Sequence, residues 1–276
     1  MSAIAETPAA EVERPPEVRR WTLERKIGNV LVGFWIVLGI ALVLYLVTSW
    51  NPELVERYFP GYMSGLWVTI KLVVLSIFFG AILSVPICYA RLSSNPVLQT
   101  LSYAYVYFFR GTPLLAQTFL IYYGLGSFRP QLQAVGLWDF FKDAFNCGVF
   151  AFTLNTAAYQ AEILRGAIQS VPKGQWEGAA SLGVPRLLTL RKIILPQALI
   201  VALRPYGNEI ILMIKGSAIV ALITVFDLMG MTRQAFSRSF DFQTYIWAAL
   251  IYLAIVETLR HAIDWIERRI TRHLKR

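Results

Sequence analysis

Long runs of uncharged, mostly apolar residues recur along this chain. Residues 30–47 and 72–90 contain no charged side chain. A helix of about 20 apolar residues is long enough to cross a hydrocarbon core of about 30 Å. Because lipid offers no partner to an unpaired backbone N–H or C=O group, such runs cross the membrane as helices. The pattern therefore predicts an all-α integral membrane protein.

Six membrane helices are predicted from these runs and their boundaries. They span about residues 29–49, 64–89, 98–125, 147–168, 198–223 and 243–263. The third is expected to break at Arg110-Gly111-Thr112-Pro113, because an internal proline removes a backbone hydrogen bond and kinks a helix. Arg110 itself is expected to reach the membrane interface or to pair with a carboxylate.

Basic residues gather on one side of the predicted bundle. With six crossings, the N-terminal flank, the turn at Arg91, the segment 165–192 and the tail from Arg260 all fall on the same side. Cytoplasmic loops are enriched in Lys and Arg, so both termini are expected in the cytoplasm. Residues 1–28 read as a disordered cytoplasmic tail and residues 266–276 as a basic one. The remaining loops carry fewer basic residues and are 50–62, 126–146 and 226–242.

Composition supports the membrane assignment and excludes several classes of function. Of the 276 residues 56% are hydrophobic and 16% charged, with a mean hydropathy of +0.52, unlike a soluble domain. The net charge of +9 is explained by contacts with anionic headgroups, and no nucleic-acid-binding motif is present. The two cysteines, Cys88 and Cys147, have no metal-ligand spacing. We expect no metal, no cofactor and no catalytic residues, and without a phosphate-binding loop the chain should not hydrolyse ATP.

The segment 170–196 differs from the other loops, because it reads as a short helix, a break and a second short helix. Gly174 is expected to turn the chain before the first helix, and Glu177 to lie in its first turn, where a carboxylate favours the helix dipole. Gly183 suits the left-handed position after that helix. Pro185 then suits the first turn of the second helix.

Small residues give this loop a surface that a partner could approach closely. Gly178, Ala179 and Ala180 follow Glu177, and Pro196 marks a further boundary before the next membrane helix. A compact helical knob of this kind is suited to docking in a groove on a partner protein. An ordinary amphipathic surface loop is the alternative.

The spacing of residues in this loop resembles the coupling-loop signature of the permease subunits of ABC importers. The matching residues are Glu177, Ala179, Gly183, Ile193, Leu195 and Pro196. Gly178 stands where the signature has alanine, a change that loosens a helix by up to about 1 kcal/mol. The resemblance implies that the loop sits in clefts of separate ATPase subunits. The residues assigned to this contact are Gly174, Glu177, Gly178, Ala179, Ala180 and Gly183.

Three further segments resemble the permeases for polar amino acids, most closely the histidine, basic amino-acid and opine branch. They are 109–117, 155–162 and 208–215. The resemblance covers about residues 60–265 and implies a five-helix type I importer core with its coupling loop at 170–196. The helix at 29–49 lies outside that core and reads as an addition.

The resemblance implies a permease subunit of a bacterial inner-membrane importer for amino acids, with alternating access driven by ATP. Its expected partners are a cytoplasmic ATPase dimer, a second permease of the same or a related kind, an external solute-binding protein, the amino-acid substrate and the lipid bilayer. An ATP-independent carrier or channel is the alternative, although such a carrier needs no docking knob. A membrane enzyme or sensor would need a catalytic cluster or a soluble domain, and the sequence suggests neither.

Polar residues at membrane depth are costly and usually face a cavity or a partner. Asn155, Tyr159 and Glu162 are spaced i, i+4 and i+7 and share one helical face. That face lines the substrate pathway, or it packs between helices with Glu162 paired to Arg165. Glu209 with Lys215 has three interpretations: the two residues line the pathway, pair with other helices or brace the coupling loop. A separate expectation is that Asp227 caps the outer end of the fifth helix or meets the external binding protein.

Overall fold

The structure is a computed structural model that describes residues 22–274, and these divide into two compact units, within residues 1–52 and 53–276. The first unit holds α1 (Leu23–Thr48). Its helix begins before the predicted boundary at residue 29, so the prediction of disorder for 23–28 is wrong. The reason is a cap, since Thr22 accepts a hydrogen bond from the Arg25 N–H at 3.4 Å. The rest of the predicted N-terminal tail lies outside the described residues.

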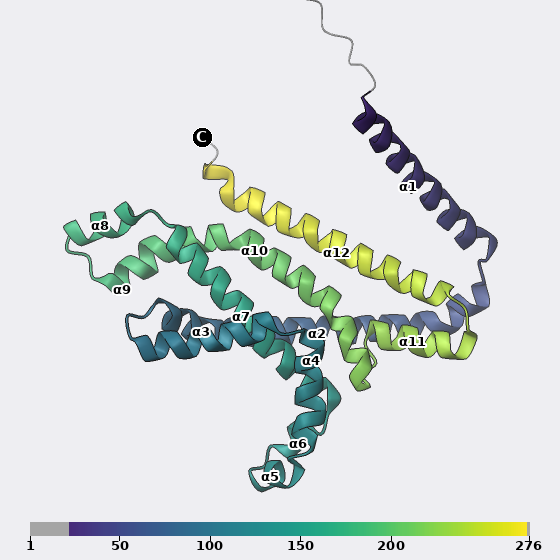
Figure 1. Ribbon diagram of the computed structural model, residues 1–276, viewed down its shortest axis with the longest axis horizontal. Coiled ribbons are helices and arrows are strands. Elements are labelled where there is room, and N and C mark those ends of the chain that lie inside the picture. Colours follow the sequence, from purple (N-terminus) through teal and green to yellow (C-terminus); the bar gives the residue numbers. More distant parts are fainter. Residues whose placement is uncertain (1–21, 275–276) are drawn as a thin grey trace, which may run out of the picture. The chain divides into compact units, whose positions relative to one another are not determined.

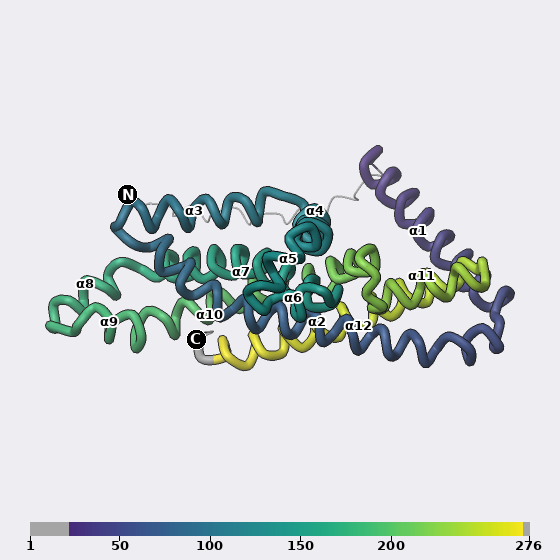
Figure 2. Tube along the Cα trace, turned by 90° about the horizontal axis from the view of Figure 1, so that it is seen from below, coloured from purple at the N-terminus to yellow at the C-terminus, as the bar shows by residue number. Residues whose placement is uncertain are grey.

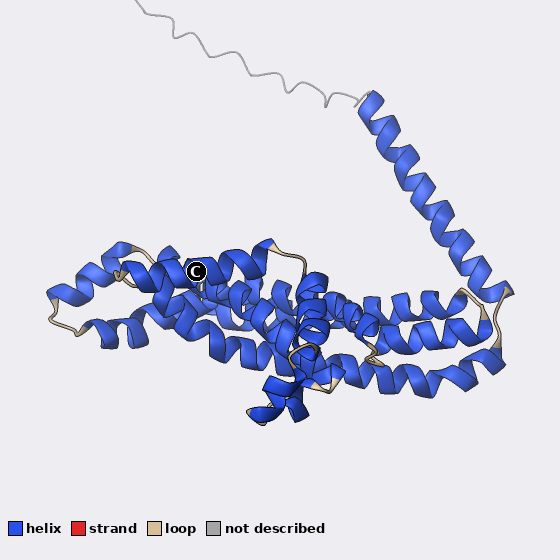
Figure 3. Cartoon of the chain, turned by 60° about the horizontal axis from the view of Figure 1, so that its bottom comes forward, coloured by secondary structure: helices blue, strands red, loops and turns tan. Residues whose placement is uncertain are grey.

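The second unit is built from helices alone over the described residues (Figures 1 and 3). In chain order they are α2 (Pro52–Leu92), α3 (Pro96–Gly111), α4 (Leu114–Phe119), η1 (Leu120–Gly124), α5 (Arg129–Ala134), α6 (Trp138–Phe141), α7 (Ala144–Ser170), α8 (Lys173–Ser181), α9 (Arg186–Thr189), η2 (Leu190–Ile194), α10 (Leu195–Gly216), η3 (Ser217–Ile223), α11 (Leu228–Ser239), α12 (Gln243–Ile270) and η4 (Thr271–Leu274). The all-α prediction is confirmed.

Four helical segments of residues 22–274 are long and apolar enough to cross a membrane. They are Leu23–Thr48, Pro52–Leu92, Arg186–Ile223 and Gln243–Ile270. Each contains or overlaps one of the predicted spans. The predicted spans at 98–125 and 147–168 stay predictions, because the first is divided into shorter helices and α7 carries many polar residues.

The helix α7 lies at the centre of the second unit and packs against α3, α4 and α10 (Figure 1). Its buried Phe152 meets Leu72 of α2 and Val220 in the main apolar cluster. The approach of α2 is close at Gly80, where a Cβ atom would lie 2.5 Å from Cγ2 of Thr156. Small residues allow membrane helices to approach one another in this way. Polar side chains on α7 are therefore held inside protein rather than in lipid.

The predicted break at residues 110–113 is present. The helix α3 ends at Gly111 and α4 starts at Leu114 behind Pro113. The two helices do not continue in one direction: Figure 2 shows α3 lengthwise where α4 is seen end-on. The interruption is thus a sharp turn of the chain and not a kink in one span.

All three of the predicted loops contain helix. Residues 52–62 form the first turns of α2, the loop 126–146 holds α5 and α6, and residues 228–239 form α11. Asp227 caps α11, because its Oδ1 accepts the Gly230 N–H at 2.8 Å. The expectation that it caps the end of the fifth helix is therefore wrong.

Candidate functional site

The helical knob between α7 and α10 begins earlier than the sequence suggested. Pro172 precedes α8 with an extended backbone (φ −53°, ψ 134°), and the helix starts at Lys173. Gly174 therefore lies within the first turn and does not turn the chain before it. Glu177 lies in the second turn, so its expected contact with the helix N-terminus is also wrong. Pro172, whose ring fixes φ near −65°, makes the turn that we assigned to Gly174.

The end of α8 matches the prediction for Gly183, which has a left-handed backbone with φ +70°. Its N–H bonds Ala180 O at 2.9 Å, and the Val184 N–H bonds Ala179 O at 3.0 Å. This pair of bonds is a Schellman motif, which closes the carbonyl end of a helix and favours glycine. The motif sets the sharp turn that leads the chain from α8 toward α9.

The second short helix runs into the membrane segment without a break. Pro185 is the N-cap of α9, one residue before its predicted place. The π-helical η2 follows, and Pro196 then lies in the first turn of α10. A proline lacks an N–H and crowds the preceding turn, and the wider π-helical turn accommodates both effects. The boundary predicted at Pro196 is therefore a change from π-helix to α-helix within a continuous helical segment.

Five of the six residues assigned to coupling lie on the surface of the knob. Gly174, Glu177, Gly178, Ala180 and Gly183 are exposed. A Cβ atom added at any of these three glycines would meet nothing within 4 Å.

The sixth residue assigned to coupling, Ala179, is buried and anchors α8 to its surroundings. Leu182 and Leu187 near the tip are 83% and 77% exposed. A hollow of about 550 Å³ between α8 and α9 is lined by residues that include Trp176 and Arg186. The knob thus presents small residues, bare leucines and a concave side to the exterior.

Asn155 on α7 supports the turn between α3 and α4. Its side chain is 6% exposed, and its Nδ2 donates to Phe109 O and to Gln117 Oε1, both at 2.9 Å. Gln117 Nε2 in turn donates to Phe109 O at 2.9 Å and to Thr112 O at 3.1 Å. Because Pro113 has no N–H to offer, carbonyl groups at this turn need other donors. The two side-chain amides supply them.

Glu162 joins three arginines on three helices. Its carboxylate accepts Arg91 Nε at 2.9 Å and Arg165 Nη2 at 2.7 Å, and Arg110 Nη1 lies 3.9 Å away. The Arg110 guanidinium carbon stands 5.1 Å from the ring centre of Tyr159. Asn155, Tyr159 and Glu162 therefore share a face as predicted, and that face meets the end of α3. The pairing of Glu162 with Arg165 that the spacing allowed is present.

Glu209 meets a neighbouring face of α7. The carboxylate is 4% exposed and accepts the hydroxyl of Thr156 at 2.8 Å. Gln160 Nε2 donates to the same hydroxyl oxygen at 3.1 Å. Thr156 is the residue after Asn155, so Glu209 contacts a different face of α7 from the one that carries Asn155.

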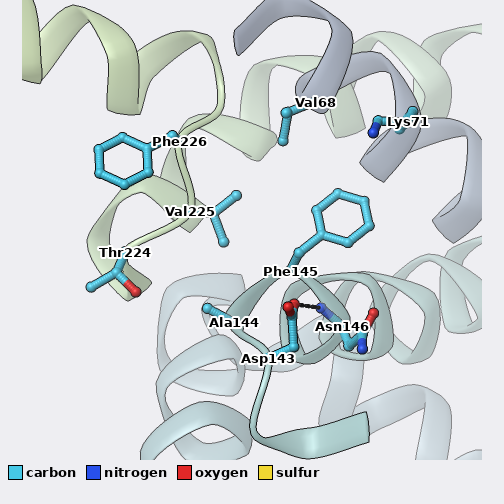
Figure 4. Close-up of a pocket in the computed structure, with 9 residues that line it drawn as sticks. All are labelled: Val68, Lys71, Asp143, Ala144, Phe145, Asn146, Thr224, Val225 and Phe226. Carbon is cyan, nitrogen blue, oxygen red and sulfur yellow. Dashed lines mark hydrogen bonds between the residues drawn. The ribbon is translucent and has the colours of Figure 1, made fainter. Parts of the chain in front are cut away.

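Lys71 was not among the predicted site residues. This residue lies near the middle of α2, inside the predicted span 64–89, and its side chain is exposed. It lines a cavity of about 420 Å³ together with Asp143, Phe145 and Thr224 (Figure 4). A single cation within an otherwise apolar run was the available signal, since such charges usually mark functional sites.

Comparison with known proteins identifies the family. Residues 73–276 match the model for the binding-protein-dependent transport system inner membrane component. The chain is 39% identical over 224 residues to the nopaline transport system permease protein NocM of Agrobacterium fabrum, covering 81% of this chain and 93% of that protein. It is 37% identical over 228 residues to the histidine/lysine/arginine/ornithine transport system permease protein HisM of Escherichia coli, covering 82% and 94%.

Solved structures agree with this assignment. A chain of an amino acid ABC transporter crystallised with histidines superposes with a TM-score of 0.72 at 36% identity, covering 79% of this chain and 98% of that one. An inward-facing MetNI methionine ABC transporter shares the fold, with a TM-score of 0.66 at 20% identity. The chain is a multi-pass protein of the bacterial inner membrane, and it belongs to the binding-protein-dependent transport system inner membrane component family, the permease subunits of ABC importers.

Proposed function

We propose that this permease imports basic amino acids or opines. The support is the set of relatives, whose names give nopaline, octopine, arginine, and histidine with lysine, arginine and ornithine as transported compounds. Transport is driven by ATP that separate subunits hydrolyse. The chain itself contributes the membrane path and the mechanical connection.

The main support for ATP-driven coupling is the exposed knob formed by α8 and α9. Its bare glycines at 174, 178 and 183 leave room for a second backbone to approach. Its exposed leucines offer apolar surface that a protein partner can bury. We infer that this surface is seated in clefts of a cytoplasmic ATPase dimer.

The orientation follows from this contact. With the knob in the cytoplasm, the turn at Arg91 and the C-terminal end of α12 lie on the same side, as the distribution of basic residues predicts. Both termini are then cytoplasmic. The helix α1 is an addition to the importer core, in keeping with a family match that begins at residue 73.

The remaining partners follow from the mechanism. An external solute-binding protein delivers the amino acid, and a second permease, identical or related, completes the path between two subunits. Closure of the ATPase dimer on ATP draws the knobs inward, and the paired bundles tilt from outward to inward access. The direct passage from η2 into α10 lets the knob move that helix without slack.

The polar face of α7 belongs to the pathway in this proposal. Asn155 and Tyr159 meet the turn at the end of α3, where Arg110 is also located. The oxygens of Glu162 are already taken by arginines, so Glu162 acts as part of a gate and not as a ligand. Glu209 is a further pathway candidate, on the neighbouring face of α7.

The test of docking is the Glu177→Arg variant, because Glu177 is exposed on the knob. Charge reversal at a close contact opposes association, so we expect ATP hydrolysis stimulated by the binding protein to fall at least tenfold. Membrane insertion should persist. Both are measured on the complex reconstituted in proteoliposomes, together with retention of the ATPase subunits on the purified permease.

A matched control is Asp264→Arg, which reverses an exposed carboxylate on α12 that lies outside the knob and on the same proposed side. It should leave stimulated hydrolysis unchanged. Normal transport by the Glu177→Arg variant would count against docking through this surface.

A further inference from the structure

Lys71 is a charged residue in an apolar stretch of α2. The helix runs from Pro52 to Leu92, so Lys71 lies at its midpoint. Within residues 22–274 no carboxylate pairs with its ammonium group, and Nζ lies over the Phe145 ring, 6.0 Å from the ring centre. A charged residue within a membrane-spanning helix usually faces a cavity or a partner. Its exposed side chain lines a cavity, which points to a partner that arrives from outside the chain.

The cavity that Lys71 lines has an anionic wall as well. Figure 4 shows Lys71 and Asp143 on opposite sides of the Phe145 ring. One carboxylate oxygen of Asp143 accepts the Asn146 N–H at 3.1 Å and caps α7. The second oxygen has no hydrogen-bond partner in the part of the chain that the structure describes. A cation, an aromatic ring and an anion thus follow one another along one hollow.

The third wall of the cavity is a strained turn. Thr224 has a left-handed backbone, with φ 67°, and the Val225 N–H bonds Val220 O at 3.2 Å to hold the turn. A β-branched residue rarely adopts this conformation, and such strain gathers at functional sites. The turn places Thr224, Val225 and Phe226 along the cavity. Its volume of about 420 Å³ falls within the range of small-molecule sites, about 300–1,000 Å³.

We propose that this cavity binds the zwitterionic head group of the transported amino acid. The Lys71 ammonium receives the α-carboxylate, Asp143 receives the α-ammonium, and Phe145 packs against the carbon between them. Asp143 precedes α7 and the knob follows it, so the site lies at the external end of the permease. The inference rests on the proposed function and adds a first receiving site for substrate released by the binding protein.

The test uses the complete importer, with permeases and ATPase subunits, in nanodiscs without its binding protein. L-Arginine is titrated by calorimetry beside agmatine, which is the same molecule without the α-carboxylate. Lys71→Gln should weaken arginine binding about tenfold or more and leave agmatine binding unchanged. Agmatine binding to the unaltered complex should be about as weak as arginine binding to the variant.

Two further variants complete the design. Asp143→Asn keeps the helix cap, because asparagine caps as well as aspartate, and it should weaken both compounds. Lys142→Gln removes a neighbouring lysine that is exposed and already paired with Asp139 at 2.6 Å, and it should change neither.

Equal loss of both compounds in Lys71→Gln would overturn the proposal, and so would an absence of arginine binding to the unaltered complex. Binding-protein-dependent amino-acid uptake that continues unchanged in Lys71→Gln would refute this site and leave the proposed function standing. If the unaltered complex imports none of these compounds, the proposed function itself fails.

Discussion

Arginines from three helices surround the carboxylate of Glu162. It bonds Arg91 at the end of α2 and Arg165 on its own helix. The pair with Arg165 could be foreseen, because the two residues are one helical turn apart. The bond to Arg91 spans 71 positions and leaves no local pattern, so the sequence could not reveal it. Lys71 was missed for a related reason. It lines a cavity whose other residues, 143–146 and 224–226, are distant in the sequence.

Replacing Glu162 by glutamine should affect the transport of all substrates alike. Partly buried hydrogen bonds to charged groups contribute about 1.5–3 kcal/mol, and the variant leaves Arg91 and Arg165 without their shared anion. We expect a lower midpoint of thermal unfolding and equal reductions in uptake of basic and neutral amino acids. A selective loss of basic amino-acid uptake would show instead that the carboxylate contacts cationic substrate.

At the scale of elements, proline and glycine predicted the structure correctly where the local backbone alone determines it. The break after Gly111 and the left-handed Gly183 were predicted correctly for this reason. The start of α8 was placed too late, since Pro172 was overlooked in favour of Gly174. The helix α11 was missed because it is amphipathic and short, and packing against α12 stabilises it. The change of direction between α3 and α4 depends on side chains from α7 that local patterns do not include.

Two glycines of the knob should respond to alanine with opposite signs. Gly183→Ala forces a Cβ into a left-handed backbone and should destabilise the end of α8 by about 1–2 kcal/mol. Gly178→Ala adds a Cβ in open space within the helix and should stabilise it by up to about 1 kcal/mol. Thermal unfolding of the purified permease and retention of the ATPase subunits report both effects. Equal behaviour of the two variants would contradict the described ending of α8.

At the scale of the whole molecule, the chain has a proposed docking surface for ATPase subunits and no phosphate-binding loop in its sequence. The permease reconstituted alone should therefore neither hydrolyse ATP nor accumulate arginine. Adding the ATPase subunits, the second permease and the loaded binding protein should restore both activities, measured as phosphate release and radiolabelled uptake in proteoliposomes. Uptake by the permease alone would be incompatible with its assignment to an ATP-driven importer.

The length of α2 bears on how a soluble carrier can reach this permease. A helix of 41 residues is about 62 Å long, roughly twice the hydrocarbon thickness of a bilayer. A helix of this length tilts in the bilayer or places its end in headgroups or water, and Glu53 and Arg57 at the start of α2 suit that setting. In the proposed orientation, a carrier arriving from outside would meet the first turns of α2 before it reached the lipid.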